Sequence, residues 1–160
     1  MGKEIEKTNV MRILDQKDIF YSSYTYNGSD ALSGIEVATI LKKDPDRVFK
    51  TLVTVGRSGE HYVFVIPVAQ ELDLKKAARA VSEKSIEMVK SKELLPLTGY
   101  IHGGCSPIGM KKFFTTTIDE TAVLFDTILF SAGKIGFQVE ISLDDLSKVI
   151  PYTLEDLTVN

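Results

Sequence analysis

The sequence contains two strongly apolar segments separated by a short loop with two glycines. Residues 47–55 and 61–68 are rich in β-branched and aromatic side chains, and Gly56-Arg57-Ser58-Gly59 follows the first of them. Apolar runs joined by so few residues predict a β-hairpin. Because both alternating faces of residues 47–55 are largely apolar, we expect a strand that is covered on both sides of a sheet.

Shorter signals predict the remaining elements. The capping box Ser33-Gly34-Ile35-Glu36 starts one helix, Asp73 caps another over 74–81, and Ser142 starts a last helix that ends before Pro151. Apolar spacing predicts a first helix over 4–17 and strands over 20–26, 113–118, 127–131 and 135–141. Since hairpins alternate with helices, we expect an α+β fold with a mixed, curled, barrel-like sheet of about six or seven strands and flanking helices. No repeat or linker divides the chain, so we expect residues 1–160 to form a single domain.

Composition and charge limit the compartment and the partners of this protein. The chain is 44% hydrophobic and 26% charged, its apolar runs are strand-sized and Met1–Lys7 is polar. We therefore expect a soluble protein without a membrane span or a secretory signal. The single cysteine, Cys105, cannot form an internal disulfide, which favours a cytoplasmic location. A net charge of −3 argues against an autonomous binder of DNA or RNA, although lysine pairs such as Lys111–Lys112 would suffice to contact one end of an RNA.

Lys50 is the residue that most directly suggests chemistry. Period two places it on the same strand face as Val48 and Leu52. An ammonium group among apolar neighbours must reach water, find an anion or lose its proton. A structural lysine that extends to solvent and a functional lysine are both compatible with this pattern.

A second candidate is the glycine-rich segment from Gly103 to Lys112. Backbone N–H groups in such a loop can hold an oxyanion or a phosphate, and a tight structural connection is the alternative. Gly104 and Gly109 have the spacing of a Walker A loop, but Met110 stands where that motif needs lysine. His102 and Cys105 lie too close in sequence to establish a nucleophile–base pair, and one Cys and two His make no metal-ligand cluster. We expect no metal and no cofactor, and a reaction that depends on positioning, a lysine charge and backbone donors.

Five segments occur in an order that is specific although each one alone is weak. They are Val48-Phe49-Lys50-Thr51-Leu52; Pro67-Val68-Ala69 with Leu72-Asp73-Leu74-Lys75-Lys76; Thr98-Gly99-Tyr100 with Gly103-Gly104; Ser106-Pro107-Ile108-Gly109 before Lys111-Lys112; and Ser131-Ala132-Gly133-Lys134 with Gly136. In this order they resemble the YbaK/EbsC family, the Cys-tRNA(Pro) deacylases related to the editing domain of bacterial prolyl-tRNA synthetases. The resemblance runs from about Tyr26 to the C-terminus, nearly the whole chain.

The resemblance implies a trans-editing enzyme that removes cysteine from the 3′ end of mischarged Cys-tRNA(Pro), with Cys-tRNA(Cys) as a further candidate substrate. It also implies that the enzyme has no protein nucleophile, because the thiol of the attached cysteine attacks its own ester and leaves as a thiolactone. Lys50 matches the functional lysine of the family. Matches to its substrate-binding positions are Tyr26, Thr51, Gly103, Gly104 and Ser131. Because the chain is acidic, we expect a complex with prolyl-tRNA synthetase to supply tRNA selectivity.

Some positions depart from the family pattern and keep alternatives open. Ser33 stands where a phenylalanine can line the cleft, Gln138 where an aspartate can follow the last glycine turn, and Ala132 where a glycine can stand. These changes leave open the removal of another small amino acid, such as alanine, from tRNA(Pro). A second alternative is a non-catalytic module that docks on tRNA or a synthetase. Lys50 together with the glycine loop favours an enzyme, since a docking module needs neither.

Overall fold

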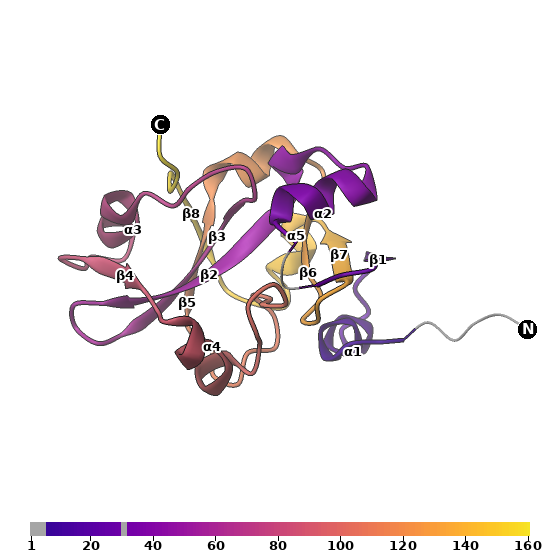
Figure 1. The fold of residues 1–160 in the computed structure, drawn as a ribbon, viewed down its shortest axis with the longest axis horizontal. Coiled ribbons are helices and arrows are strands. Elements are labelled where there is room, and N and C mark those ends of the chain that lie inside the picture. Colours follow the sequence, from indigo (N-terminus) through magenta and orange to yellow (C-terminus); the bar gives the residue numbers. More distant parts are fainter. Residues whose placement is uncertain (1–5, 30–31) are drawn as a thin grey trace, which may run out of the picture.

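The computed structural model describes residues 6–29 and 32–160, and its elements are labelled in Figure 1. The strands of this part of the chain are β1 (Ser22–Thr25), β2 (Phe49–Gly56), β3 (His61–Pro67), β4 (Ile86–Met88), β5 (Thr115–Asp119), β6 (Ile128–Ser131), β7 (Phe137–Ile141) and β8 (Thr153–Glu155). The helices are α1 (Asn9–Gln16), α2 (Gly34–Leu41), α3 (Leu74–Ala80), α4 (Ser91–Thr98) and α5 (Leu143–Leu146), with 3-10 turns η1 (Pro45–Arg47) and η2 (Glu120–Leu124).

The strands form two sheets that meet near the start of β2. One sheet has the order β1-β7-β6 and is antiparallel, and the other has the order β4-β2-β3-β5-β8. In the second sheet β4, β2 and β3 are antiparallel neighbours, while β5 and β8 join in parallel, so it is a mixed sheet. A single parallel bridge between Val48 and Leu129 connects the two sheets.

The expected α+β class with a mixed sheet is confirmed, but the single barrel-like sheet is wrong. The eight strands of the described chain are close in number to the six or seven expected, yet they divide into two sheets and close no barrel there. The reason lies at the bridge. β6 meets the start of β2 through only one residue pair, and the rest of its ladder is formed with β7. The sheet therefore ends at this junction and does not wrap around.

The predicted hairpin is confirmed and forms the centre of the fold. β2 and β3 pair from Phe49↔Pro67 to Val55↔His61, and the Gly56 N–H donates to the Glu60 carbonyl at 2.8 Å to close the loop. Both faces of the hairpin are covered, as expected from its apolar alternation. Val63 and Val65 belong to the larger core, whereas Phe64 and Ile66 pack with residues of α3 in a second core. Burying each such side chain stabilises the fold by about 1.5–3 kcal/mol.

Predicted caps hold the helices in place. Ser33 and Glu36 form the capping box of α2, with reciprocal backbone-to-side-chain hydrogen bonds of 3.1 and 3.2 Å. Asp73 accepts from the N–H groups of Lys75 and Lys76 at the start of α3. The capping box places Ala38 in a small core with Val48, Val68 and Leu129, at the junction of the sheets. α2 therefore covers the start of β2.

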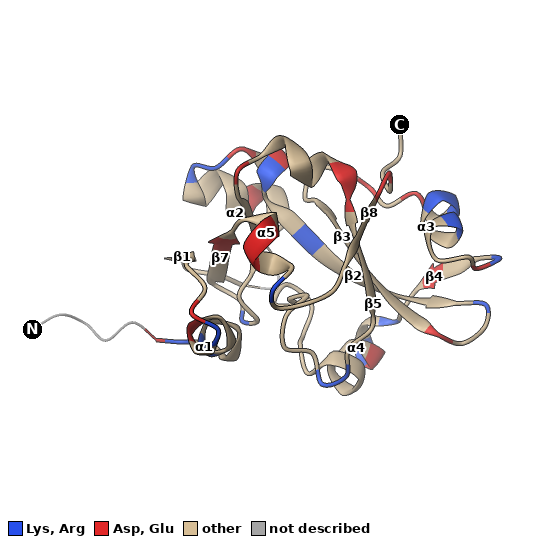
Figure 2. Ribbon diagram, turned by 180° about the vertical axis from the view of Figure 1, so that it is seen from behind, with Lys and Arg blue, Asp and Glu red and all other residues tan. Residues whose placement is uncertain are grey.

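Other boundaries differ from the expectations. α1 begins at Asn9, and residues 4 and 5 of the predicted first helix lie outside the described residues. α5 has one turn, and α4, β4 and β8 were not expected from the sequence. Lys90, the N-cap of α4, makes no side-chain cap hydrogen bond, and Pro96 lies inside the helix, so this helix lacks the usual local signals. Across residues 6–29 and 32–160 there is no helix with the length and apolar character needed to cross a membrane. Basic and acidic positions are interspersed over the ribbon (Figure 2).

Candidate functional site

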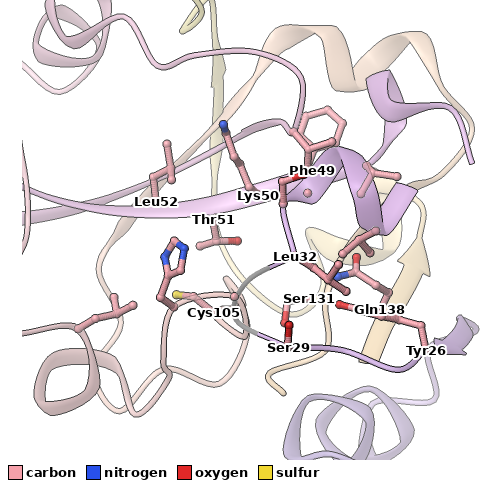
Figure 3. A pocket seen from close by; sticks show the side chains of 18 residues that line it. Tyr26, Ser29, Leu32, Phe49, Lys50, Thr51, Leu52, Cys105, Ser131 and Gln138 are labelled. Carbon is pink, nitrogen blue, oxygen red and sulfur yellow. The ribbon is translucent and has the colours of Figure 1, made fainter. Parts of the chain in front are cut away.

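A cavity of about 290 Å³ lies along β2, between the start of α2, the glycine loop and the ends of β6 and β7. Its size suits a small ligand or one end of a larger one. Figure 3 shows this cavity from close by. The described residues that line it are Tyr26, Ser29, Leu32, Ser33, Gly34, Val37, Val48, Phe49, Lys50, Thr51, Leu52, Val68, Leu94, His102, Gly103, Cys105, Ser131 and Gln138.

Strand alternation directs two neighbouring residues to opposite sides of β2. Lys50 and Leu52 leave the strand on one side, and Thr51 leaves it on the other (Figure 3). The strand start is fixed at the junction of the sheets, because Val48 bridges to Leu129 and its carbonyl accepts from the Val68 N–H at 2.8 Å. Lys50 follows this anchor by two residues, so its backbone position is well determined.

The structure brings five of the six sequence-predicted site residues to the cavity. These are Tyr26, Lys50, Thr51, Gly103 and Ser131. Gly104 is not among the lining residues. Its N–H donates to the Ile101 carbonyl at 3.0 Å, and a Cβ on it would lie 3.1 Å from the backbone nitrogen of Ile135. Gly104 therefore allows two loops to pack closely behind the cavity wall.

Lys50 carries a charge that the described protein does not neutralise. Its side chain is half-buried and makes no hydrogen bond or ion pair with any described residue. Burial lowers the pKa of Lys50, and the nearby charge of Glu71 offsets part of this effect. Such a group gains from an anionic or strongly polar ligand that replaces the lost hydration.

Cys105 lines the cavity but is a poor nucleophile. Burial raises the pKa of its thiol to about 12, so the thiol stays protonated near neutral pH. Because the thiolate is the reactive form, this environment disfavours attack by the protein's own sulfur. His102, also on the cavity wall, is exposed and hydrogen-bonds no described hydroxyl or thiol. No three His, Cys, Asp or Glu side chains of the described residues gather in the manner of a metal site.

At two positions of the cavity wall, the local geometry explains why the residue is glycine. Gly103 adopts φ +86°, a conformation that favours glycine, and its N–H is bonded to no described residue. This N–H remains available for a ligand oxygen. Gly34 starts α2 where a Cβ would lie 2.5 Å from Val68 Cγ1. The absence of a side chain at Gly34 lets α2 approach the end of β3 and narrows the cavity.

The β6–β7 end of the cavity contains a residue that sequence reasoning noted only as a departure from the family pattern. Ser131 and Gln138 are directly opposite each other in the ladder between these strands. The Ser131 hydroxyl accepts from the Gly133 N–H at 3.1 Å, and the Tyr26 N–H donates to the Gly136 carbonyl at 3.0 Å. Gln138 Oε1 is buried without a hydrogen-bond partner in the described structure. A lone amide within an apolar strand was the signal for this site residue.

Comparison with known proteins places the chain in a family. The model of the aminoacyl-tRNA editing domain matches residues 30–149. The chain is 49% identical over 141 residues to the protein named as the Cys-tRNA(Pro)/Cys-tRNA(Cys) deacylase EbsC of Enterococcus faecalis, which covers 88% of this chain and 86% of that protein.

Two crystal structures share the fold at lower identity. One, described as a trans-editing enzyme for prolyl-tRNA synthetase, has a TM-score of 0.81 at 20% identity and covers 97% of this chain and 100% of its own. A hypothetical protein gives a TM-score of 0.84 at 18% identity, over 94% of this chain and 99% of its own. At these identities the likeness concerns the fold. The family model and the 49% identical relative show the family: the chain belongs to the aminoacyl-tRNA editing domain family.

Proposed function

We propose that this chain is a trans-editing deacylase that removes cysteine from mischarged Cys-tRNA(Pro), with Cys-tRNA(Cys) as a second substrate. The support is a relative at 49% identity that is named for this activity, together with a cavity suited to one small end of a larger ligand. The proposed editing unit is the whole chain, residues 1–160. An enzyme with this substrate works in the cytoplasm, where tRNA is charged.

The mechanism is supported by the burial of Cys105 in the cavity wall, which raises the pKa of its thiol to about 12. With this pKa, the Cys105 thiol is not ionised near neutral pH. The thiol of the attached cysteine is therefore the better candidate for the nucleophile. In the proposed step the cysteine sulfur bonds to its own ester carbon, and the bond from that carbon to the ribose oxygen breaks. The thiol proton ends on the ribose hydroxyl, which leaves free tRNA and a cyclic thiolactone. Water then opens the thiolactone to cysteine.

The proposed roles of the cavity residues follow from this step. An attack within one molecule gains rate from correct positioning alone, so the protein needs only to hold the ester and the thiol together. Lys50 orients the ester or the terminal adenosine and offsets the negative charge that develops at the reacting oxygen. Thr51, Tyr26 and Ser131 contact the substrate, and the free Gly103 N–H is a second donor to that oxygen.

The proposed partners are the 3′ end of the mischarged tRNA and prolyl-tRNA synthetase. A net charge of −3 gives the chain little general attraction for RNA. A complex with the synthetase would deliver the correct tRNA without a large basic surface on this protein. The description of one structural relative as a trans-editing enzyme for prolyl-tRNA synthetase supports the same partner.

A deacylation assay over Cys-tRNA(Pro), Cys-tRNA(Cys), Ala-tRNA(Pro) and Pro-tRNA(Pro) tests the proposal. We expect release of cysteine from both tRNAs, with alanine and proline retained. Preferential release of alanine would show that the enzyme removes a small amino acid other than cysteine. Binding of these tRNAs without release of any amino acid would make the chain a docking module.

A further inference from the structure

Gln138 has a buried acceptor that the protein leaves unsatisfied. The residue is 7% exposed, it lines the cavity, and Oε1 has no partner among the described residues. Buried side-chain polar atoms almost always have a hydrogen-bond partner, because a buried orphan acceptor is unfavourable. Thr51 Oγ1 is a second such atom on the same cavity. Two orphan atoms on one cavity indicate that polar groups of a ligand complete their hydrogen bonds.

The chemistry of the amide oxygen limits what this ligand group can be. A carboxamide oxygen only accepts hydrogen bonds, so its partner must be a donor. The ester carbonyl and the phosphates of an aminoacylated 3′ end are acceptors and are excluded on this ground. The strong donors at this end are the α-ammonium group, the ribose 2′-hydroxyl and the exocyclic amine of adenine, since the cysteine thiol donates only weakly.

The surroundings of Gln138 favour the α-ammonium group. Ser131, opposite Gln138 in the ladder, presents a second oxygen at the same end of the cavity, and Tyr26 lies there as well (Figure 3). An ammonium group carries three N–H donors and gains most where several oxygens converge. Figure 3 shows the Lys50 side chain leaving β2 on the side opposite Thr51, whereas Ser131 and Gln138 lie near each other at the β6–β7 end of the cavity.

We propose that Gln138 is a positioning residue whose Oε1 accepts a hydrogen bond from the α-amino group of the aminoacyl end. This inference rests on the proposed function, since it takes an aminoacylated 3′ adenosine as the ligand. It adds a residue that reads the group common to all amino acids. Fixing the α-nitrogen restricts rotation at the α-carbon, which turns the side-chain sulfur toward the ester carbon. Gln138 therefore acts through the orientation of the substrate.

The test compares substrates that differ only in the amino group. Cys-tRNA(Pro) and 3-mercaptopropionyl-tRNA(Pro) have the same thiol and the same ester, and only the first has an α-amino group. Gln138→Met keeps the length of the side chain and removes the amide oxygen, whereas Gln138→Glu keeps acceptor oxygens. We expect Gln138→Met to lower kcat/KM on Cys-tRNA(Pro) by about tenfold or more, a typical effect of losing one hydrogen bond to a charged group. On 3-mercaptopropionyl-tRNA(Pro) it should match the wild type, and Gln138→Glu should retain activity on both.

A binding measurement keeps the inference testable without catalysis. The stable probes are 3′-cysteinylamino-3′-deoxyadenosine and its 3-mercaptopropionyl counterpart, titrated by calorimetry. We expect the wild type to bind the first about tenfold more tightly than the second, and Gln138→Met to lose this difference. Equal affinity of the wild type for both probes, or an equal loss with both in Gln138→Met, would overturn the inference. A wild type that binds as expected but releases no cysteine from tRNA would instead refute the proposed function.

Discussion

Arg47, two residues before the start of β2, donates a 3.0 Å hydrogen bond from Nη2 to Oε2 of Glu140 in β7. The same carboxylate accepts from the hydroxyl groups of Tyr24 at 2.6 Å and Thr127 at 2.5 Å. Arg47 precedes Val48 and Thr127 lies two residues before Leu129, so the network is close to the bridge that joins the two sheets. Through it, the smaller sheet fixes the place at which the strand carrying Lys50 begins.

Removing the charge of Glu140 should weaken the fold. Glu140→Gln keeps the shape of the side chain but loses charge-assisted hydrogen bonds, each worth about 1.5–3 kcal/mol. We expect the free energy of unfolding, measured with urea at pH 7, to fall by about 1–3 kcal/mol. Glu87→Gln, at an exposed position of β4, is the matched control and should behave as the wild type. An unchanged value in Glu140→Gln would show that the network contributes nothing to stability.

The same variant has an expected pH dependence. Burial raises the pKa of Glu140, but hydrogen bonds from Thr127 and Tyr24 and the charges of Lys43 and Arg47 outweigh this effect and lower it overall. A carboxylate with a lowered folded-state pKa stabilises the protein fully above its unfolded value of about 4.3 and loses this contribution as the pH falls through the folded value. Urea titrations should therefore show the gap between wild type and Glu140→Gln narrowing below about pH 4.

Replacing Lys50 should separate activity from stability. Loss of one oriented electrostatic contact lowers the rate by about 100- to 1,000-fold, and we expect this of Lys50→Met in single-turnover deacylation. Because burial lowers the pKa of Lys50, the folded state disfavours its charged form below the unfolded pKa of about 10.4. The variant should thus be at least as stable as the wild type at pH 7, and this difference should shrink as the pH rises toward that value.

The control for this substitution is Lys84→Met, at an exposed position outside the cavity. It removes the same charge and should leave both activity and thermal stability unchanged. If Lys50→Met folds and deacylates at the wild-type rate, the assignment of Lys50 as a site residue is wrong.

Cys105 should be dispensable for turnover. Its thiol is protonated near neutral pH because burial raises its pKa to about 12. We expect Cys105→Ser to retain most of its activity, and iodoacetamide to label native Cys105 much more slowly than the unfolded chain at pH 7. Mass spectrometry of the labelled protein gives the rate. An acyl group trapped on Cys105 during deacylation would contradict the substrate-thiol mechanism.

Gly34→Ala should disturb the cavity through close contacts with one side chain, that of Val68, whose Cβ would lie 2.6 Å from the added Cβ. The added Cβ would lie 2.5 Å from Val68 Cγ1, and overpacking of this kind costs about 1–3 kcal/mol. Val68→Gly removes both the methyl groups and the Cβ of Val68, so the double variant should be more stable than the sum of the single effects predicts. Thermal unfolding of the wild type and the three variants measures this coupling. Strict additivity would mean that the two residues do not interfere.

Locally coded features were predictable from sequence, whereas the meeting of the sheets was not. The hairpin around Gly56 and the capping box at Ser33 depend on neighbouring residues, and both were found as expected. The bridge from Val48 to Leu129 connects residues 81 positions apart and has no local signal. β8 and α4 were also missed because they lack local signals. Among the described strands β8 pairs with the distant β5, and α4 has no side-chain cap.

The site divides in the same way. Lys50 stood out because an ammonium group interrupts an apolar strand, and the adjacent Thr51 came with the family motif. Gln138 became a site residue only through its surroundings, because an unsatisfied oxygen depends on which atoms fold around it. The packing role of Gly104 likewise required the loop at Ile135, which lies 31 residues away in sequence. The local sequence pattern thus predicted the charged site residue Lys50, whereas the unsatisfied oxygen of Gln138 depends on tertiary packing.

The reaction should require a thiol on the amino acid that is removed. Serine differs from cysteine by one atom, and a single small change in a pocket is usually worth about 1–3 kcal/mol of binding, so fit alone would separate the two only weakly. Chemistry separates them strongly, because a thiol with a pKa of about 8.5 ionises appreciably near neutral pH and an alcohol does not. In the proposed mechanism Lys50 stabilises the charge that develops during this attack, whereas attack by an activated water would give similar rates with both substrates.

We therefore expect fast deacylation of Cys-tRNA(Pro), slow deacylation of Ser-tRNA(Pro), and a sulfur-containing cyclic product that precedes free cysteine. Single-turnover rates on the two substrates give the ratio, and mass spectrometry of the quenched reaction identifies the first product. Pro-tRNA(Pro), which has no side-chain nucleophile, is the control and should remain charged. Comparable rates for the cysteinyl and seryl substrates, with free amino acid as the first product, would assign the attack to water and make the chain a general deacylase.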